Sequence, residues 1–217
     1  MSSTVKNPEV RIKYGWLLVE NASKPLNELW GEGEPLRSDD EYLQIVDSYQ
    51  KEWKKYEVKI LNGVQKITGL QFRQNVIDVY IAPWFIAFSD PMVIGVTQKP
   101  DKFIDVLTHE LIHRILTDNL SIPHDYWLLD EFKKLFGAEH DFNTVIHIPV
   151  HAIHEKIYLD TLKEPARLHR DKFGWGEDAQ AEYSKAWDYV EKEGADKIIE
   201  RLKKSYAEIA KNLEKKK

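Results

Sequence analysis

The amino-acid sequence predicts an α+β fold, with a small N-terminal sheet and two helices followed by a mainly helical C-terminal half. Runs rich in β-branched and aromatic residues nearly vanish beyond Asn119. Apolar residues recur at steps of three and four over long stretches in both halves. With 217 residues the chain suits one domain or two small lobes. We expect a single unit, with an N-terminal lobe over 1–119 and a C-terminal lobe over 120–217.

The N-terminal lobe is expected to contain a small mixed or antiparallel sheet and two helices. Ser38 and Glu41 have the spacing of a capping box, which begins a long helix that backs the sheet, and Gly69 ends that helix. Apolar, β-branched runs separated by turn residues predict the strands. The expected elements are a strand over 9–19, a helix over 38–69, strands over 75–81 and 84–97, and a helix from residue 100 to about residue 119.

The C-terminal lobe is expected to be mostly helical. Pro149 fits the first turn of a helix, because its missing N–H has no helical partner there. Gly194 is expected to divide the last helical stretch. The expected elements are an amphipathic helix over 124–136, a helix over 149–162, and helices from 179 to the end of the chain.

Composition and charge exclude several classes of protein. The 31 basic and 36 acidic residues are interleaved along the chain, so there is no basic stripe of the kind that binds nucleic acid. No apolar run is long enough to span a bilayer, and the first residues do not resemble a signal peptide. The chain has no cysteine, which excludes disulfides and thiolate ligands. We therefore expect a cytoplasmic protein with no nucleic-acid and no membrane partner.

His109, Glu110 and His113 match the pattern H-E-x-x-H within the helix that begins at residue 100. Four residues at about 100° each bring the two imidazoles to within about 40° of one helix face, so that both can reach one metal ion. Glu110 lies on the flank of that face, where it can take a proton from a water molecule without being a ligand. The sequence predicts His109 and His113 as metal ligands and Glu110 as a general base.

A catalytic zinc site usually has three protein ligands and one open position. Leu116 and Asn119 occupy the positions at which metzincins carry a glycine and a third histidine, so that family is excluded. A second cluster of histidines, over 147–154, is the natural source of the third ligand.

If 149–162 forms one helix, its polar side carries Lys156 and Asp160. The opposite side then carries His151, His154 and Tyr158, with Glu155 at its edge. Packing alone hardly explains a helix that buries such groups. From the residues alone, His151, His154 or Glu155 could complete the metal site.

These residues together resemble the gluzincin metallopeptidases, in which a glutamate on a following helix completes the HExxH site. The resemblance implies a zincin-like fold and one Zn²⁺ per chain, bound by His109, His113 and Glu155. In several gluzincins the ligand glutamate directly follows a histidine, as Glu155 follows His154 here. The resemblance also implies that the strand before the HExxH helix, here over 91–97, is an edge strand that binds extended peptide.

The resemblance further implies a zinc-dependent metallopeptidase that acts on peptide or protein substrates. The ion lowers the pKa of its water, and Glu110 takes the proton and passes it to the leaving amine. Tyr158 and His154 are the expected catalytic donors to the developing oxyanion. His151, His169 and Tyr183 are alternatives for that donor.

Two other functions remain open. One is a zincin-fold metal-binding protein without peptidase activity, which would be favoured if the segment over 29–35 blocks the site. The other is a metal-dependent hydrolase that acts on a non-peptide amide or ester. An unblocked strand edge beside the metal favours a peptide substrate, and a closed pocket favours a small molecule.

Overall fold

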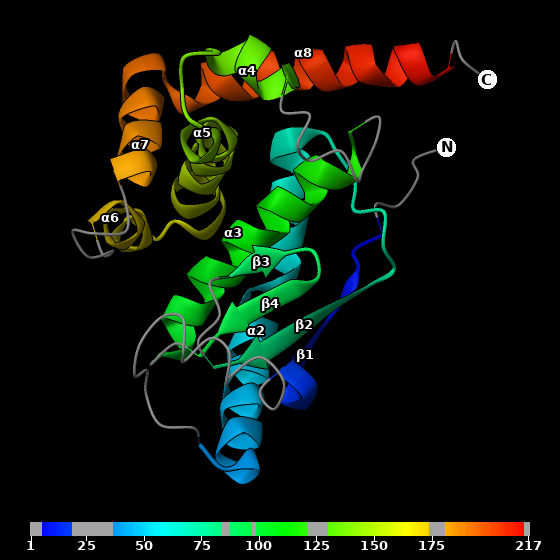
Figure 1. Cartoon of the computed structure of the whole chain (residues 1–217), viewed down its shortest axis with the longest axis vertical. Coiled ribbons are helices and arrows are strands. Elements are labelled where there is room, and N and C mark those ends of the chain that lie inside the picture. The colour runs from blue at the N-terminus through cyan, green and yellow to red at the C-terminus, as the bar shows by residue number, and fades with distance from the viewer. Residues whose placement is uncertain are drawn as a thin grey trace. The chain divides into compact units, whose positions relative to one another are not determined.

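A computed structural model describes residues 6–18, 37–83, 87–96, 99–120, 130–173 and 181–214 (Figure 1). The elements are β1 (Glu9–Tyr14), α2 (Asp39–Thr68), β2 (Val76–Ala82), β3 (Phe88–Ser89), β4 (Met92–Gly95), α3 (Pro100–Asp118), α4 (Asp130–Phe136), α5 (Phe142–Lys156), the π-helix η1 (Ile157–Leu162), α6 (Pro165–Phe173), α7 (Ala181–Glu193) and α8 (Ala195–Glu214). The predicted α+β architecture is confirmed: a small mixed sheet and a long helix precede a mostly helical part.

The chain forms two compact units. The first comprises Met1–Val58 and Gln74–Arg114, and the second comprises Lys59–Arg73 and Ile115–Lys217. None of the helices in the described ranges combines the length and the hydropathy that a bilayer crossing needs.

The first unit contains a four-stranded mixed sheet in the order β1-β2-β4-β3 (Figure 1). β1 pairs in parallel with β2, from Glu9 opposite Val76 to Tyr14 opposite Ile81. β2 pairs in parallel with β4, and β3 runs antiparallel to β4. Parallel neighbours need a long crossover connection, and α2 lies in the connection between β1 and β2.

The strand that precedes α3 is not an edge strand, contrary to the prediction. β4 is flanked by β2 on one side and by β3 on the other. β3 contains only two residues and pairs with Met92 and Val93 of β4. The chain thus reverses direction at Asp90 and Pro91, and β3 covers part of the expected edge of β4.

The predicted limits of α2 are confirmed by its hydrogen bonds. The backbone N–H of Ser38 donates to Glu41 Oε2 at 2.8 Å, and the N–H of Glu41 donates to Ser38 Oγ at 3.4 Å. These bonds satisfy backbone donors that have no partner inside the helix. Gly69 ends the helix at a φ of 73°, a conformation that glycine adopts without strain. The buried face of α2 includes Tyr42, Tyr49, Trp53, Ile60 and Val64.

In the second unit, two side chains and one backbone N–H donate to carbonyl groups at the end of α3. The last four carbonyls of a helix have no donor inside the helix. Asn119 Nδ2 donates to the carbonyl of Ile115 at 2.8 Å, and the N–H of Leu120 donates to that of Thr117 at 3.1 Å. The hydroxyl of Tyr206 on α8 donates to the carbonyl of Leu116 at 2.7 Å. Tyr206 therefore anchors α8 to the last turn of α3.

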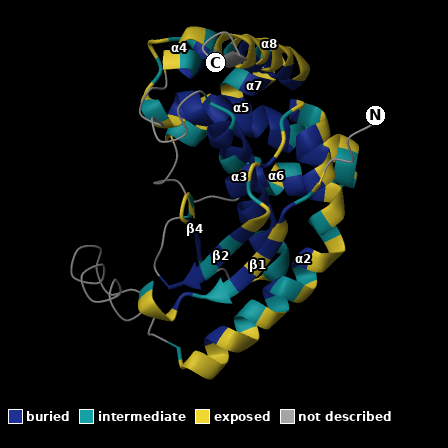
Figure 2. Ribbon diagram, turned by 90° about the vertical axis from the view of Figure 1, so that its right-hand side faces the viewer, coloured by how far each residue is buried: buried dark blue, intermediate teal, exposed yellow. Residues whose placement is uncertain are grey.

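α5 begins earlier than the sequence predicted, at Phe142 rather than Pro149. Asp141 caps it, because its side chain accepts the N–H of Thr144 at 2.8 Å. Pro149 lies inside the helix and removes one backbone hydrogen bond. Every residue from Thr144 to His154 is buried, so tertiary packing outweighs that loss (Figure 2).

The remaining helices of the second unit agree with the sequence in part. Gly194 separates α7 from α8 at a φ of 86°, as predicted. α4 falls in the predicted amphipathic stretch, whose residues 124–129 lie outside the described residues. α6 was not predicted, because the residues that it buries, Arg167 and Asp171, are polar and give no apolar pattern.

Replacing Tyr206 with phenylalanine should lower the free energy of unfolding by about 1–2 kcal/mol, because the buried carbonyl of Leu116 loses its donor. Chemical denaturation measures the change. Tyr189→Phe is the matched control, since that half-buried hydroxyl only accepts a 3.3 Å bond from Arg201, and we expect a change within about 0.5 kcal/mol. Equal losses in the two variants would contradict a specific anchor at Leu116.

Candidate metal centre

His109 and His113 lie one turn apart on α3 with their ring nitrogens facing each other. The two Nε2 atoms are 3.1 Å apart, and the rings are tilted by 64°. Two nitrogens bound to one tetrahedral zinc at 2.0–2.1 Å would be separated by about 3.3 Å. The histidine pair therefore has the spacing of two ligands of one ion.

His147 on α5 completes a group of three buried histidines. One ring nitrogen from each of His109, His113 and His147 can be chosen so that all three lie within 4.8 Å of one another. Imidazole is a common ligand for zinc, copper, iron and nickel. These residues could hold a metal ion.

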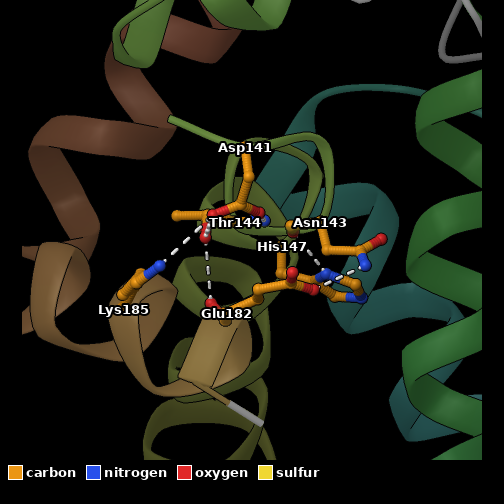
Figure 3. Close-up of polar contacts among 6 residues, drawn as sticks. All are labelled: Asp141, Asn143, Thr144, His147, Glu182 and Lys185. Carbon is orange, nitrogen blue, oxygen red and sulfur yellow. Dashed lines mark hydrogen bonds and ion pairs between the residues drawn. The ribbon is translucent and has the colours of Figure 1, made fainter. Parts of the chain in front are cut away.

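The hydrogen bond of His147 fixes which ring nitrogen carries the proton. Nδ1 lies 2.6 Å from the backbone carbonyl oxygen of Asn143 (Figure 3). A carbonyl can only accept, so Nδ1 donates and Nε2 carries the lone pair that a metal needs. Burial lowers the pKa of His147 to about 4, so the ring is neutral at pH 7. His147 is thus prepared as an Nε2 ligand.

Glu110 follows His109 on the HExxH helix and is buried. Burial raises the pKa of its carboxyl to about 8. A cation bound beside it would favour the ionised form. A carboxylate in such a place can accept a proton from water, and the general-base role of Glu110 stays a prediction.

Arg114 ties the HExxH helix to the turn between β3 and β4 within the first unit. Its Nη1 lies 2.8 Å from Asp90 Oδ1 and donates to the carbonyl of Ser89 at 3.2 Å. Since Arg114 directly follows His113, these bonds restrain the turn that carries the motif.

Glu155, the predicted third ligand, lies in a different group of charges. Its carboxylate is half-buried, with one oxygen 3.9 Å from Lys172 Nζ. Burial raises the pKa of Glu155, and the nearby lysines oppose that shift. Lys172 also pairs with Glu191 at 2.8 Å and lies over the ring of Trp187. Among the described residues the structure groups His147, and not Glu155, with the motif, and the ligand role of Glu155 stays a prediction.

The other histidines of α5 are packed inside the second unit. His154 Nδ1 lies 2.9 Å from Asp171 Oδ2, and its ring centroid is 4.3 Å from that of Tyr158. His151 stacks on Trp187 at 4.3 Å. The catalytic roles of His154 and Tyr158 stay predictions.

Exposure distinguishes these side chains from the candidate centre. His151 and His154 are 0% exposed. The four residues of the centre each keep 6–7% exposure: His109, Glu110, His113 and His147. The alternative donors to the oxyanion differ from each other in exposure. His169 is exposed, whereas Tyr183 is half-buried with its ring centroid 4.1 Å from that of His147.

The sequence contained an indication of His147 that the predicted helix boundary concealed. His147 and His151 are four residues apart, the spacing of neighbours on one helix face. Beginning the helix at Pro149 left His147 outside it. A helix from Asp141, an N-cap residue type, would have included His147 with the other candidates.

The chain was compared with models of protein families, with curated proteins and with solved structures. No family model matches it. No curated protein and no solved structure matches it either. The candidate centre therefore rests on the geometry of its own side chains.

The purified chain should bind one metal ion through His109, His113 and His147. Changing any one of them to alanine should weaken the binding of Zn²⁺, Co²⁺ or Ni²⁺. Loss of a residue that only hydrogen-bonds to a ligand costs about 10- to 100-fold in affinity, and loss of a ligand should cost more. Titration calorimetry and metal analysis measure this. Glu155→Ala is the matched control on the same helix and should bind as the unaltered chain does. If Glu155→Ala lost the ion and His147→Ala kept it, Glu155 would be the third ligand.

Proposed function

We propose that this chain is a zinc-dependent hydrolase that cleaves peptide bonds, with His109, His113 and His147 as ligands and Glu110 as the general base. One observation carries the proposal. Glu110 adjoins a pair of imidazoles whose Nε2 atoms lie 3.1 Å apart, and a third buried histidine lies within ligand reach of that pair. The motif and the geometry thus both support His109 and His113 as metal ligands.

The donor set fits zinc. Three neutral nitrogens make a ligand set that catalytic zinc sites use, with a fourth position open to water. The Nδ1–H of His147 is engaged by a carbonyl, which leaves the Nε2 lone pair for the ion. Structural zinc sites instead have four protein ligands, and the group found among the described residues has three.

The residues of the centre have distinct tasks in the proposed reaction. When bound, zinc supplies a Lewis acid that polarises the substrate carbonyl and makes water nucleophilic near neutral pH. A Glu110 carboxylate oxygen accepts the proton of the attacking water and then delivers it to the leaving amine nitrogen. The peptide bond is replaced by a carboxylic acid and an amine. The three histidines bind the ion and take no proton.

The sheet supports a peptide as the substrate. β3 pairs with Met92 and Val93 of β4, and within the described residues no strand pairs with Ile94 and Gly95 on that side. An extended peptide could pair with this stretch by main-chain hydrogen bonds. Arg114 connects β3 and its turn to the HExxH helix in the same unit.

Burial favours a second candidate, a hydrolase of small amides or esters. The four side chains of the centre are only 6–7% exposed, which suits a substrate smaller than a polypeptide. The same three ligands and the same base would serve that reaction. The segment over 29–35, which could cover the site, lies outside the described residues.

Glu110→Gln should keep the metal and lose the reaction, because glutamine has the shape of glutamate but cannot accept the proton. We expect kcat to fall about 10²- to 10⁴-fold. Mass spectrometry of a peptide-library digest, with a panel of amide and ester substrates beside it, measures the activity, and metal analysis measures the zinc. Glu155→Gln is the matched control and should retain activity. An active Glu110→Gln variant would remove Glu110 from the role of base, and ester cleavage without peptide cleavage would select the second candidate.

A further inference from the structure

The N-terminal ends of α5 and α7 are held together by hydrogen bonds to one residue, Glu182 (Figure 3). Asn143 Nδ2 donates to Glu182 Oε2 at 2.6 Å. The hydroxyl of Thr144 contacts both the backbone oxygen of Glu182, at 3.2 Å, and Asp141 Oδ2, at 2.8 Å. Lys185 Nζ, one turn further along α7, lies 3.6 Å from Asp141 Oδ2. All of these residues belong to the second unit.

The same end of α5 controls His147. The oxygen that accepts the Nδ1–H of His147 is the backbone carbonyl of Asn143. Side chains on a helix tilt toward its N-terminus, so residue 147 reaches the carbonyl four positions earlier. The first turn of a helix frays readily, so bonds that hold residue 143 help to keep this carbonyl in place. The bond from the amide of Asn143 to Glu182 adds to the restraint that the Asp141 cap gives this turn.

We propose that Glu182 is a positioning residue for the metal ligand His147. Its carboxylate holds Asn143, and the carbonyl of Asn143 in turn holds the His147 ring with the proton on Nδ1 and the lone pair on Nε2. Nothing links Glu182 itself to the ion. The inference rests on the proposed metal site and identifies the helix pair that orients one of its ligands.

The effect has a physical basis in the two tautomers of imidazole. A neutral ring that loses its acceptor at Nδ1 can carry its proton on Nε2, the atom that the ion requires. Outer partners that orient a ligand histidine are worth about 10- to 100-fold in metal affinity. Glu182 acts one step further out, and the Asp141 cap also holds this turn, so we expect a loss of about three- to tenfold.

The test compares zinc affinity in Glu182→Ala, Glu182→Gln and Asn143→Ala. Glu182→Ala and Asn143→Ala should each weaken binding about three- to tenfold, and the double variant should be no weaker than either one. Glu182→Gln should bind as the unaltered chain does, since its amide oxygen still accepts from Asn143. Glu193, at the far end of α7, is the control position, and Glu193→Ala should leave the zinc affinity unchanged.

A second cycle separates positioning from a general structural role. In the His147→Ala background, residual zinc binding should be insensitive to Glu182→Ala. In the metal-free protein, ¹⁵N shifts of the His147 ring should show Nδ1 protonated, and Glu182→Ala should shift the population toward Nε2 protonation. Thermal unfolding of the metal-free variants shows whether they are folded. If Glu182→Ala does not fold, the comparison of Asn143→Ala with Glu182→Gln still tests the proposal.

The outcomes distinguish the two proposals. If the unaltered chain binds no metal, the proposed function fails. If His147→Ala loses zinc while Glu182→Ala and Asn143→Ala bind normally, with the tautomer unchanged, the metal site stands and the positioning role is overturned. If Glu182→Ala weakens binding equally with and without His147, its effect does not pass through that ligand, which also overturns the role.

Discussion

The contact between the Nε2 atoms of His109 and His113 is the constraint on which the rest of the candidate centre depends. At 3.1 Å, two protonated nitrogens would repel, and two bare lone pairs would also repel. One of the two must donate to the other, or both must direct their lone pairs at a cation. Because both rings are buried, water relieves the pair less than it would at the surface. A shared metal ion satisfies both nitrogens at nearly the observed spacing.

The fold holds the helix that imposes this constraint at both sides of the motif. In the first unit, Arg114 binds the turn after β3. In the second unit, Asn119 and Tyr206 satisfy carbonyls of the last turn of α3. A helix restrained in this way cannot easily rotate its polar residues toward solvent. The cost of burying them is offset by partners such as the contact between His109 and His113, and a bound metal ion would offset it further.

Local patterns accounted for much of the fold and for three of the four residues of the candidate centre, all but His147. The capping box of Ser38, the glycines at 69 and 194 and the HExxH spacing depend on neighbours within one turn, and each has the predicted conformation or position. Local patterns did not predict the start of α5. The helix extends through Pro149 because eleven successive residues around it are buried, and their packing outweighs the loss of one hydrogen bond. α6 gave no apolar pattern, since the residues that it buries, Arg167 and Asp171, are polar. The short return strand β3 depends on a turn and on sheet pairing rather than on periodicity.

The histidines of α5 show why residue type alone could not assign the third ligand. His147, His151 and His154 share one helix and are all buried, but each has a different neighbour. His154 lies against the carboxylate of Asp171, and His151 lies flat on an indole ring. His147 meets a backbone carbonyl, which can only accept and therefore determines which nitrogen keeps its lone pair. The partner atom, which no sequence spacing specifies, thus makes His147 the member of the cluster best prepared to bind an ion.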